Sequence, residues 1–311
     1  MTTTDAKGFS GSARLAALQM GSRATTTETL AALLARRDEL QAARLDLLVL
    51  PEALLGGYPK GADFGVRLGY RTAPGREVFR RYWEQAIDLD GPEVAALGEL
   101  AADVGCTIIC GAIVRDGATL HCTALHMAPD GRLAGHRRKL MPTAAERLVW
   151  GQGGPTDVRS FDSPIGRIAP VICWENFMPH FRAALYEQGV TIWAAPTVDE
   201  RPQWEVAMRH IAHEGRCFLV SACQWLPPSQ IALGDPITLV DRPSDAPLIA
   251  GGSMIVSPMG DVLAGPLRGG EGLLVAEVDM ADVVRARFDF DAAGHYSRPD
   301  IFTLDVAGAT R

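Results

Sequence analysis

The segment PVICWENFMPHF (residues 170–181) sets a short apolar run directly against polar and aromatic residues. Pro170 to Ile172 have the character of a buried strand, and Cys173 stands at its end. A free cysteine is among the most buried residue types, so the simpler interpretation of Cys173 is a core residue. The abrupt turn behind it, and the helical segment that follows, favour a nucleophile held at a strand end. Backbone N–H groups there would be available to a developing negative charge.

Strand-like and helix-like patterns alternate on both sides of this segment. Short apolar strands are predicted at residues 13–20, 46–52, 106–114, 166–173, 190–197 and 217–225, with a Pro-Asp-Gly hairpin at 123–140. Helices are predicted at residues 28–40, 91–105, 178–189 and 203–215, and Thr25 with Glu28 forms a possible capping box before the first. Apolar strands separated by helices predict an α/β fold in which helices cover the sheets.

Two similar segments, MAPDGRLAG (127–135) and VSPMGDVLAG (256–265), indicate two similar halves within one domain. Similar turn chemistry alone would give the same likeness. Residues 1–12 lack the pattern of a signal peptide and are predicted to be a disordered leader. One domain is predicted for residues 13–283. Residues 284–311 are polar with scattered aromatic side chains, so we expect an extended arm that forms an interface.

Composition argues against several classes of protein. The chain of 311 residues is 47% hydrophobic, which suffices for a large core, and its net charge is −7. Because no long basic block occurs, we expect neither nucleic acid nor membrane as a partner. No apolar run approaches the roughly 20 residues needed to cross a bilayer. The 6 cysteines form no CxxC pair, which favours a reduced, cytoplasmic protein over a disulfide scaffold.

Three predicted strands end in residues that are able to do chemistry. One ends in Glu52, one in Cys173, and one is followed by the polar run at 198–200. Because ligands gather beyond the carboxyl ends of strands in α/β sheets, we expect the carboxylate and the thiol to share a pocket. The alternative for Glu52 is a surface acid. Four further residues near these ends are predicted to line the pocket, with ordinary core positions as the alternative: Tyr58, Trp174, Trp193 and Pro196.

A third candidate lies in GHRRKLMPTAAERLVWGQG (135–153), where Lys139 stands between a basic strand and an apolar turn. A basic run of this kind is usually a solvated strand edge that discourages aggregation. Here Lys139 is followed by apolar residues and then by Glu146. A cation held beside a cysteine would favour the thiolate, which is the nucleophilic form.

These residues resemble the Glu-Lys-Cys triad of the nitrilase superfamily of carbon–nitrogen hydrolases. Glu52 in LPEALLGGYPKG, Lys139 in HRRKLMPT and Cys173 in VICWENFMP occur in the family's chain order. The likeness covers nearly the whole chain, to the tail FDFDAAGHYSRPDIF. The motifs GYPKG, ERLVWGQG, CWEN and GHYSRPD resemble the nitrilase branch more than its amidase or carbamoylase relatives. The resemblance implies a four-layer α-β-β-α sandwich that assembles into homodimers or larger homo-oligomers.

The resemblance also implies a reaction. Cys173 would attack the carbon of a nitrile while Glu52 takes the thiol proton and returns it to nitrogen. The resulting thioimidate would add water, lose ammonia and leave a thioester, from which a second water releases the carboxylic acid. Lys139 and the Trp174 N–H would stabilise the tetrahedral centres, and Glu146 would orient Lys139 or the substrate nitrogen. No metal or organic cofactor is implied.

The chain departs from the family pattern at one place. Many nitrilases carry a histidine where Thr143-Ala144-Ala145 precedes Glu146 here. An amidase or carbamoylase with the same triad is one alternative function, and a non-catalytic scaffold in which Cys173 is merely packed is another. A scaffold would not need a buried trio of charged residues, so an enzyme is favoured. Arylacetonitriles, aromatic nitriles and aliphatic nitriles all remain candidate substrates.

Overall fold

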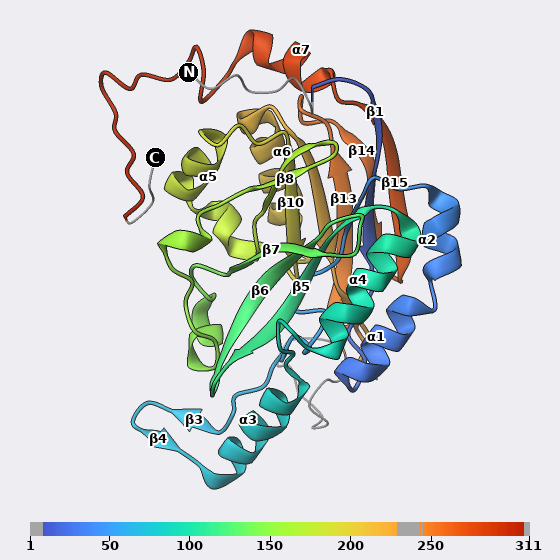
Figure 1. Ribbon diagram of the computed structural model, residues 1–311. Coiled ribbons are helices and arrows are strands. Elements are labelled where there is room, and N and C mark those ends of the chain that lie inside the picture. Colours follow the sequence, from blue (N-terminus) through green and yellow to red (C-terminus); the bar gives the residue numbers. More distant parts are fainter. Residues whose placement is uncertain (1–8, 229–242, 244, 308–311) are drawn as a thin grey trace.

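Two β-sheets pack face to face in the computed structural model, and helices cover the outer face of each sheet (Figure 1). The structure describes residues 9–228, 243 and 245–307. Residues 1–8 of the predicted leader and residues 308–311 of the predicted arm therefore lie outside the described residues. Within the described part of the chain, the predicted four-layer α-β-β-α sandwich is confirmed.

The first sheet, as far as the described residues define it, has 6 strands in the order β15-β1-β2-β5-β6-β7. The strands β1, β2 and β5 run parallel, and every other neighbouring pair is antiparallel. The bounds are β1 Ser12–Gln19, β2 Leu47–Val49, β5 Thr107–Asp116, β6 Thr119–Met127, β7 Leu133–Arg138 and β15 Gly272–Asp279.

The second sheet has the order β12-β13-β11-β10-β9-β8, with β14 also paired to β13. Here β9, β10 and β11 run parallel, while β13 is antiparallel to both β11 and β14. The bounds are β8 Phe161–Ser163, β9 Gly166–Pro170, β10 Ile192–Thr197, β11 Phe218–Cys223, β12 Trp225–Leu226, β13 Ile249–Val256 and β14 Val262–Arg268.

The two sheets repeat one plan, since each has three parallel strands followed by an antiparallel pair. The pairs are the hairpins β6–β7 and β13–β14, whose turns lie in the two similar sequence segments. The predicted likeness of two halves is therefore present in the strand order as well as in the turn chemistry. It also places the carboxyl ends of β2 and β9, one from each half, in the same region of the molecule.

Helices on the first sheet are α1 (Thr26–Leu34), α2 (Arg37–Ala43) and α4 (Pro92–Val104), and those on the second are α5 (Pro179–Tyr186) and α6 (Pro202–Gly215). The helix predicted at 28–40 is thus two helices. Its predicted capping box is confirmed, because Glu28 N–H donates to Thr25 Oγ1 and Thr25 N–H donates to Glu28 Oε2, both at 3.1 Å. The sequence did not predict α3 (Ala73–Gln85), which protrudes at one end with the short strands β3 (Val66–Arg67) and β4 (Tyr70–Arg71) (Figure 1).

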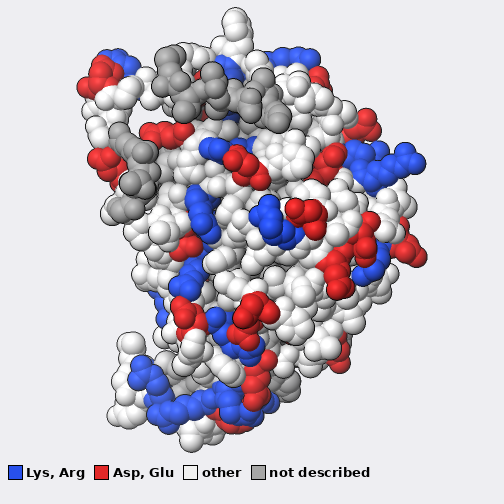
Figure 2. Space-filling view, in the orientation of Figure 1, with Lys and Arg blue, Asp and Glu red and all other residues white. Residues whose placement is uncertain are grey.

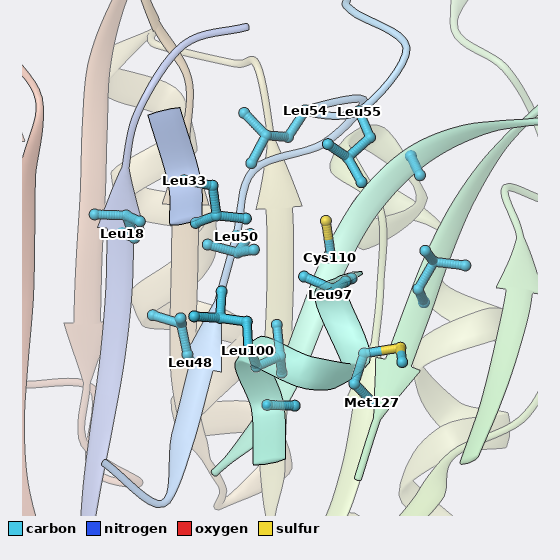
Figure 3. Close-up of a cluster of buried hydrophobic side chains, with 14 of the residues drawn as sticks. Leu18, Leu33, Leu48, Leu50, Leu54, Leu55, Leu97, Leu100, Cys110 and Met127 are labelled. Carbon is cyan, nitrogen blue, oxygen red and sulfur yellow. The ribbon is translucent and has the colours of Figure 1, made fainter. Parts of the chain in front are cut away.

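Both faces of the parallel strands are apolar, because each face is covered. In β1, Ala16 and Leu18 belong to the cluster under the helices, whereas Leu15 and Ala17 belong to the cluster between the sheets. Figure 3 shows the first of these clusters, where leucines of the strands meet leucines of α1 and α4. This covering of both faces explains why the strands appear in the sequence as continuous apolar runs.

The predicted extended arm begins as a helix, because α7 (Asp282–Asp289) crosses the expected boundary at residue 284. The expectation of an extended conformation from the first residue of the arm is therefore wrong. Helical spacing brings Val283 and Ala286 onto one buried face of α7, which the aromatic and charged residues between them obscure in the sequence. Residues 290–307 beyond α7 contain neither helix nor strand and run along the outside of the molecule (Figure 1).

Among the described residues, no helix has the length and apolar character needed to cross a bilayer. Acidic and basic side chains are mixed over most of the face shown in Figure 2. Basic side chains gather at the lower end, over β3–β4 and α3, where Arg67, Arg71 and Arg76 are exposed. The expectation that nucleic acid is not a partner stays a prediction.

Candidate active site

The structure brings Glu52, Lys139, Glu146 and Cys173 together beyond the ends of strands from both sheets. Glu52 follows β2, Lys139 follows β7, and Cys173 follows β9. Glu146 lies in the short 3-10 helix η1 (Ala144–Leu148). The Lys139 Nζ lies 2.6 Å from Glu52 Oε1 and 2.7 Å from Glu146 Oε2. Side chains far apart in the sequence thus form one buried charged cluster.

Cys173 has an unusual backbone conformation. It begins the 3-10 helix η3 (Cys173–Phe177) with a φ of 50°, in the left-handed region that residues with a Cβ seldom adopt. The amide of Asn176 holds this turn, because its Nδ2 donates to the carbonyl oxygens of Cys173 at 2.7 Å and Val171 at 3.0 Å. Strained backbone of this kind persists only where its surroundings over-determine it, and it concentrates at functional sites.

The thiol of Cys173 is protonated at rest. Burial, followed by the neighbouring Glu52 carboxylate, raises the pKa of Cys173 above its ordinary range, and Lys139 and Thr197 lower it by less. The Thr197 hydroxyl donates to Cys173 Sγ at 3.3 Å. Lys139 thus lowers the pKa of the thiol, as expected, but burial raises that pKa by more. A buried thiol of this kind needs a base to remove its proton before it can attack.

Glu52 has the properties of such a base. Burial raises the pKa of Glu52 to about 7; Lys139 lowers it, Glu146 raises it, and a contact with the Cys173 thiol lowers it. Its Oε1 accepts from Lys139, and the Cys122 Sγ lies 3.7 Å away. Its Oε2 is buried and accepts no well-formed hydrogen bond within the described part of the chain. A carboxylate with one unsatisfied oxygen and a pKa near neutrality can both accept and donate a proton.

Close backbone packing holds Glu52 in place. The Gln224 side chain donates from Nε2 to the Glu52 carbonyl oxygen at 2.7 Å. A Cβ on Gly111, in the neighbouring strand β5, would lie 2.5 Å from the Glu52 Cα and 2.3 Å from the Pro51 carbonyl oxygen. Gly111 is therefore required for this approach, and any larger residue would displace Glu52.

Lys139 and Glu146 support each other. The side chain of Lys139 is excluded from solvent, and burial lowers its pKa, but attraction to Glu52 and other neighbouring groups raises the pKa more, so the ammonium stays charged. Glu146 also accepts from the Tyr58 hydroxyl at 2.9 Å and the Thr143 N–H at 2.6 Å. Glu146 is therefore held by three donors, even though Ala144 and Ala145 precede it.

A cavity of about 210 Å³ opens beside this cluster. Of the four residues predicted to line it, Tyr58 and Trp174 do so, whereas Trp193 and Pro196 do not. Trp193 is fully buried under α5 and α6, on the other face of β10, and donates from Nε1 to Asn176 Oδ1 at 2.7 Å. Pro196 is buried within the same strand. The error for Trp193 arises because alternate residues of a strand point to opposite faces.

Several cavity residues were not predicted. The run at 198–200 was recognised as a strand end, and all three of its residues border the cavity. The remaining unpredicted neighbours are Lys60, Thr143 and Arg201. Asp199 joins two parts of the rim, because it accepts from Trp174 Nε1 at 2.9 Å and pairs with Arg201. A polar run directly after an apolar strand was the signal that would have identified this rim.

Comparisons with known proteins agree with this geometry. The carbon-nitrogen hydrolase family model matches residues 14–288. An aliphatic nitrilase of Sinorhizobium fredii is 49% identical over 86% of this chain and 86% of its own length. A bifunctional nitrilase/nitrile hydratase of Lupinus angustifolius is 48% identical over 84% of this chain and 76% of its own.

Solved structures show the fold shared more widely. A CN-hydrolase superfamily protein of Xanthomonas campestris has a TM-score of 0.72 at 19% identity, over 95% of this chain and all (100%) of that one. An amidase of a Nesterenkonia species has a TM-score of 0.63 at 18% identity, over 89% of this chain and 94% of that one. Because the amidase shares the fold, the branch is decided by the closer sequence relatives. The chain belongs to the carbon–nitrogen hydrolase family and, within it, to the nitrilase branch.

Proposed function

We propose that this nitrilase hydrolyses a small aliphatic nitrile to the carboxylic acid and ammonia, with Cys173 as the nucleophile. The observation that supports the assignment most is the pairing of a protonated thiol with a buried carboxylate whose pKa is about 7. The protonated thiol cannot attack until a base removes its proton, and Glu52 is a base that can do so. Cys173 borders the cavity and Glu52 contacts its thiol, which supports a shared role.

In the first step Glu52 takes the proton of the Cys173 thiol as the sulfur attacks the nitrile carbon. A carbon–sulfur bond forms and one carbon–nitrogen bond order is lost, which leaves negative charge on nitrogen. Glu52 returns the proton there, so the product is a neutral thioimidate. A pKa close to neutrality makes the same carboxyl effective in both directions.

In the second stage water adds to the thioimidate carbon, and Glu52 takes a proton from that water. The ammonium of Lys139 and the backbone N–H of Trp174 stabilise the charge that develops. This N–H has no acceptor among the described residues, as an oxyanion donor requires. Proton return to nitrogen lets ammonia leave, and a second water hydrolyses the remaining thioester to the acid.

The walls of the cavity favour a small aliphatic substrate. Beyond Cys173 they combine charged residues, among them Lys60, Glu200 and Arg201, with the aromatic side chains of Tyr58 and Trp174, and the volume is about 210 Å³. A cavity of this volume, with charged side chains among its walls, has more room for a short aliphatic chain than for a large ring. The relative that is 49% identical is named as an aliphatic nitrilase, which agrees with this choice.

We propose acid as the main product and amide as a minor one. The tetrahedral centre gives acid if it expels ammonia, and amide if it expels the thiolate. Expulsion of ammonia needs a protonated nitrogen and a stabilised centre. Tyr58 and Thr143 hold Glu146 by hydrogen bonds, and Glu146 in turn keeps Lys139 in place for this. Relatives named as both nitrilase and nitrile hydratase make the amide worth measuring.

The test is a panel of aliphatic, aromatic and arylacetonitrile substrates together with the matching amides. Ammonia release and chromatography of acid and amide would be measured for wild type and for Cys173→Ala as the blank. We expect acid from small aliphatic nitriles above all. Amide as the main product throughout would indicate a hydratase, turnover of amides alone would indicate an amidase, and no turnover would indicate a scaffold.

We also propose a cytoplasmic homodimer or larger homo-oligomer in which the C-terminal arm forms an interface. Three aromatic side chains of the arm are strongly exposed: Phe288 at 85%, Tyr296 at 61% and Phe302 at 75%. A subunit interface along the arm would remove this apolar surface from water. The six cysteines are all free and buried, in keeping with a reducing compartment. Light scattering of wild type and a Phe288→Ser, Phe302→Ser variant tests the assembly, and unchanged mass would contradict the role of the arm.

A further inference from the structure

A second buried ion pair lies directly beside the triad. Arg137 and Glu175 have side chains with 0% exposure, and the guanidinium donates to both carboxylate oxygens, at 2.6 and 2.7 Å. Neither residue borders the cavity. Basic runs usually form a solvated strand edge, but this interpretation is wrong for Arg137, because its side chain is buried. Buried pairs are weak evidence for stability, because desolvation offsets their attraction, so the pair needs another explanation.

The carboxylate of Glu175 joins the backbone beside two triad residues. Its Oε2 accepts from the N–H of Ile172 at 2.9 Å, and its Oε1 accepts from the N–H of Leu140 at 2.6 Å. Ile172 immediately precedes Cys173, and Leu140 immediately follows Lys139. One side chain thus connects the nucleophile turn of the second sheet to the end of β7 in the first sheet.

Arg137 fixes that carboxylate from the other side. Besides its two bonds to Glu175, it donates from Nε to the Asp157 carbonyl at 2.9 Å, from Nη1 to the Pro170 carbonyl at 3.0 Å, and from Nη2 to the Arg138 carbonyl at 3.0 Å. All five donors of the guanidinium are therefore used. With its hydrogen bonds complete in a rigid fork, the side chain can hold Glu175 in one geometry.

We propose that Arg137 and Glu175 are positioning residues that set the spacing between the Cys173 sulfur and the Lys139 ammonium. The proposal rests on the proposed function, since that spacing matters only if the two groups act on one substrate. The two halves of the molecule supply these groups separately, and the pair crosses the junction between them. Misplacement of a reacting group by about 1 Å can cost roughly 100-fold in rate.

The decisive variants are Glu175→Gln and Arg137→Lys. Glu175→Gln replaces one acceptor oxygen with an amide NH2 group, which is a donor, so the side chain cannot accept from both backbone N–H groups and the fork. Arg137→Lys keeps the charge and loses the fork. For each folded variant we expect kcat to fall by roughly 100-fold while KM stays within about threefold, because the cavity is untouched.

A pH profile separates positioning from general stability. Lys139 lowers the pKa of Glu52, which also faces Glu146, Cys173 and Cys122. If the pair positions Lys139, its loss weakens that effect, and the acidic limb of kcat/KM moves to higher pH. A merely structural loss lowers the amount of folded enzyme without moving the limb.

A matched control exists elsewhere in the chain. Arg23 donates to both oxygens of Glu271, at 2.7 and 3.0 Å, and Glu271 also accepts the Gly21 N–H at 3.0 Å. This pair is partly exposed and does not border the cavity. Glu271→Gln should lower the melting temperature with no shift of the acidic limb and no change in kcat per folded molecule.

Alkylation of Cys173 by iodoacetamide, followed by peptide mass mapping, does not depend on nitrile turnover. Glu52 takes the thiol proton during alkylation, so the alkylation midpoint follows the pKa of Glu52. Lys139 lowers that pKa, and displacement of Lys139 should therefore move the midpoint to higher pH in both variants. If wild type hydrolyses no nitrile, this measurement still tests the positioning role. A kcat within about threefold of wild type, with both pH midpoints unchanged, would overturn the proposal. Arg137→Lys decides the matter if Glu175→Gln does not fold.

Discussion

Arg137 and Lys139 are two positions apart at the end of one strand, and both are excluded from solvent, yet their surroundings differ. The carboxylate that pairs with Arg137 accepts four hydrogen bonds, two from the guanidinium and two from backbone N–H groups. The carboxylate of Glu52, which pairs with Lys139, has one oxygen without a well-formed bond among the described residues. Both carboxylate oxygens of Glu175 thus accept hydrogen bonds, whereas only one oxygen of Glu52 does.

This difference separates Glu175, which holds its neighbours in position, from Glu52, which exchanges a proton. A carboxylate whose oxygens all accept hydrogen bonds is held in one geometry by its donors. An incompletely satisfied one is penalised by burial, and its pKa rises toward the value where proton transfer in both directions is efficient.

The largest effect is expected from removal of the nucleophile. Cys173→Ala should lower kcat by at least about 10⁴-fold, because no other group can form the covalent intermediate. Cys217→Ala, at a buried cysteine under α6, is the matched control and should keep wild-type kcat. Ammonia release would be measured for both. Substantial turnover by Cys173→Ala would show that Glu52 and Lys139 do not act on the thiol of Cys173.

The next largest effect is expected from Glu52→Gln. The amide is nearly isosteric but cannot accept the thiol proton, so kcat should fall by about 10³-fold. Mass spectrometry of enzyme mixed with nitrile should detect no thioimidate. Rapid formation of the adduct by Glu52→Gln would mean that another group takes the proton.

The two variants should rank in the opposite order for stability and for activity. Glu175→Gln leaves a buried charge on Arg137 without its partner and should reduce the free energy of unfolding by about 3–5 kcal/mol. Glu52→Gln leaves Lys139 paired with Glu146 and removes a poorly satisfied oxygen, so the change should stay within about 1 kcal/mol. Urea unfolding measures both. Equal losses would contradict the distinction between the two clusters.

A smaller but specific effect is expected from Lys139→Arg. The charge is kept, but the planar guanidinium cannot take the place of a compact ammonium between two carboxylates. We expect kcat to fall by more than tenfold, a barrier increase above about 1.4 kcal/mol. Steady-state kinetics on the best nitrile decide it, and a milder loss would make Lys139 a bystander.

The mildest perturbation is a change of pH in the wild-type enzyme. Glu52 must be ionised to act as a base, and its pKa is raised to about 7, so kcat/KM should decline as the pH falls below that value. The decline should approach tenfold per pH unit, as for loss of one essential base. A limb near pH 4.5, the ordinary pKa of a glutamate, would show that burial does not act on Glu52 as the structure indicates.

The sequence by itself determined the class of fold and the principal site residues. Alternating strands and helices are visible as local periodicity, and Glu52, Lys139 and Cys173 occur in motifs that can be recognised in chain order. The segment that forms α3 was missed, since its start at residues 73–76 contains a proline and a glycine, which give a weak helical pattern. Local signals of this kind survive without any knowledge of distant contacts.

Only the tertiary structure decided which charged residues are paired, and with what. Arg137 and Glu175 lie in separate motifs, and nothing local shows that one meets the other. Likewise, only packing shows that Trp193 faces the helices, and that burial outweighs Lys139 at the thiol. Burial and pairing are properties of three-dimensional neighbours, and desolvation acts only once those neighbours have excluded water. The sequence therefore predicted which residues react, whereas their ionisation and alignment depend on the assembled fold.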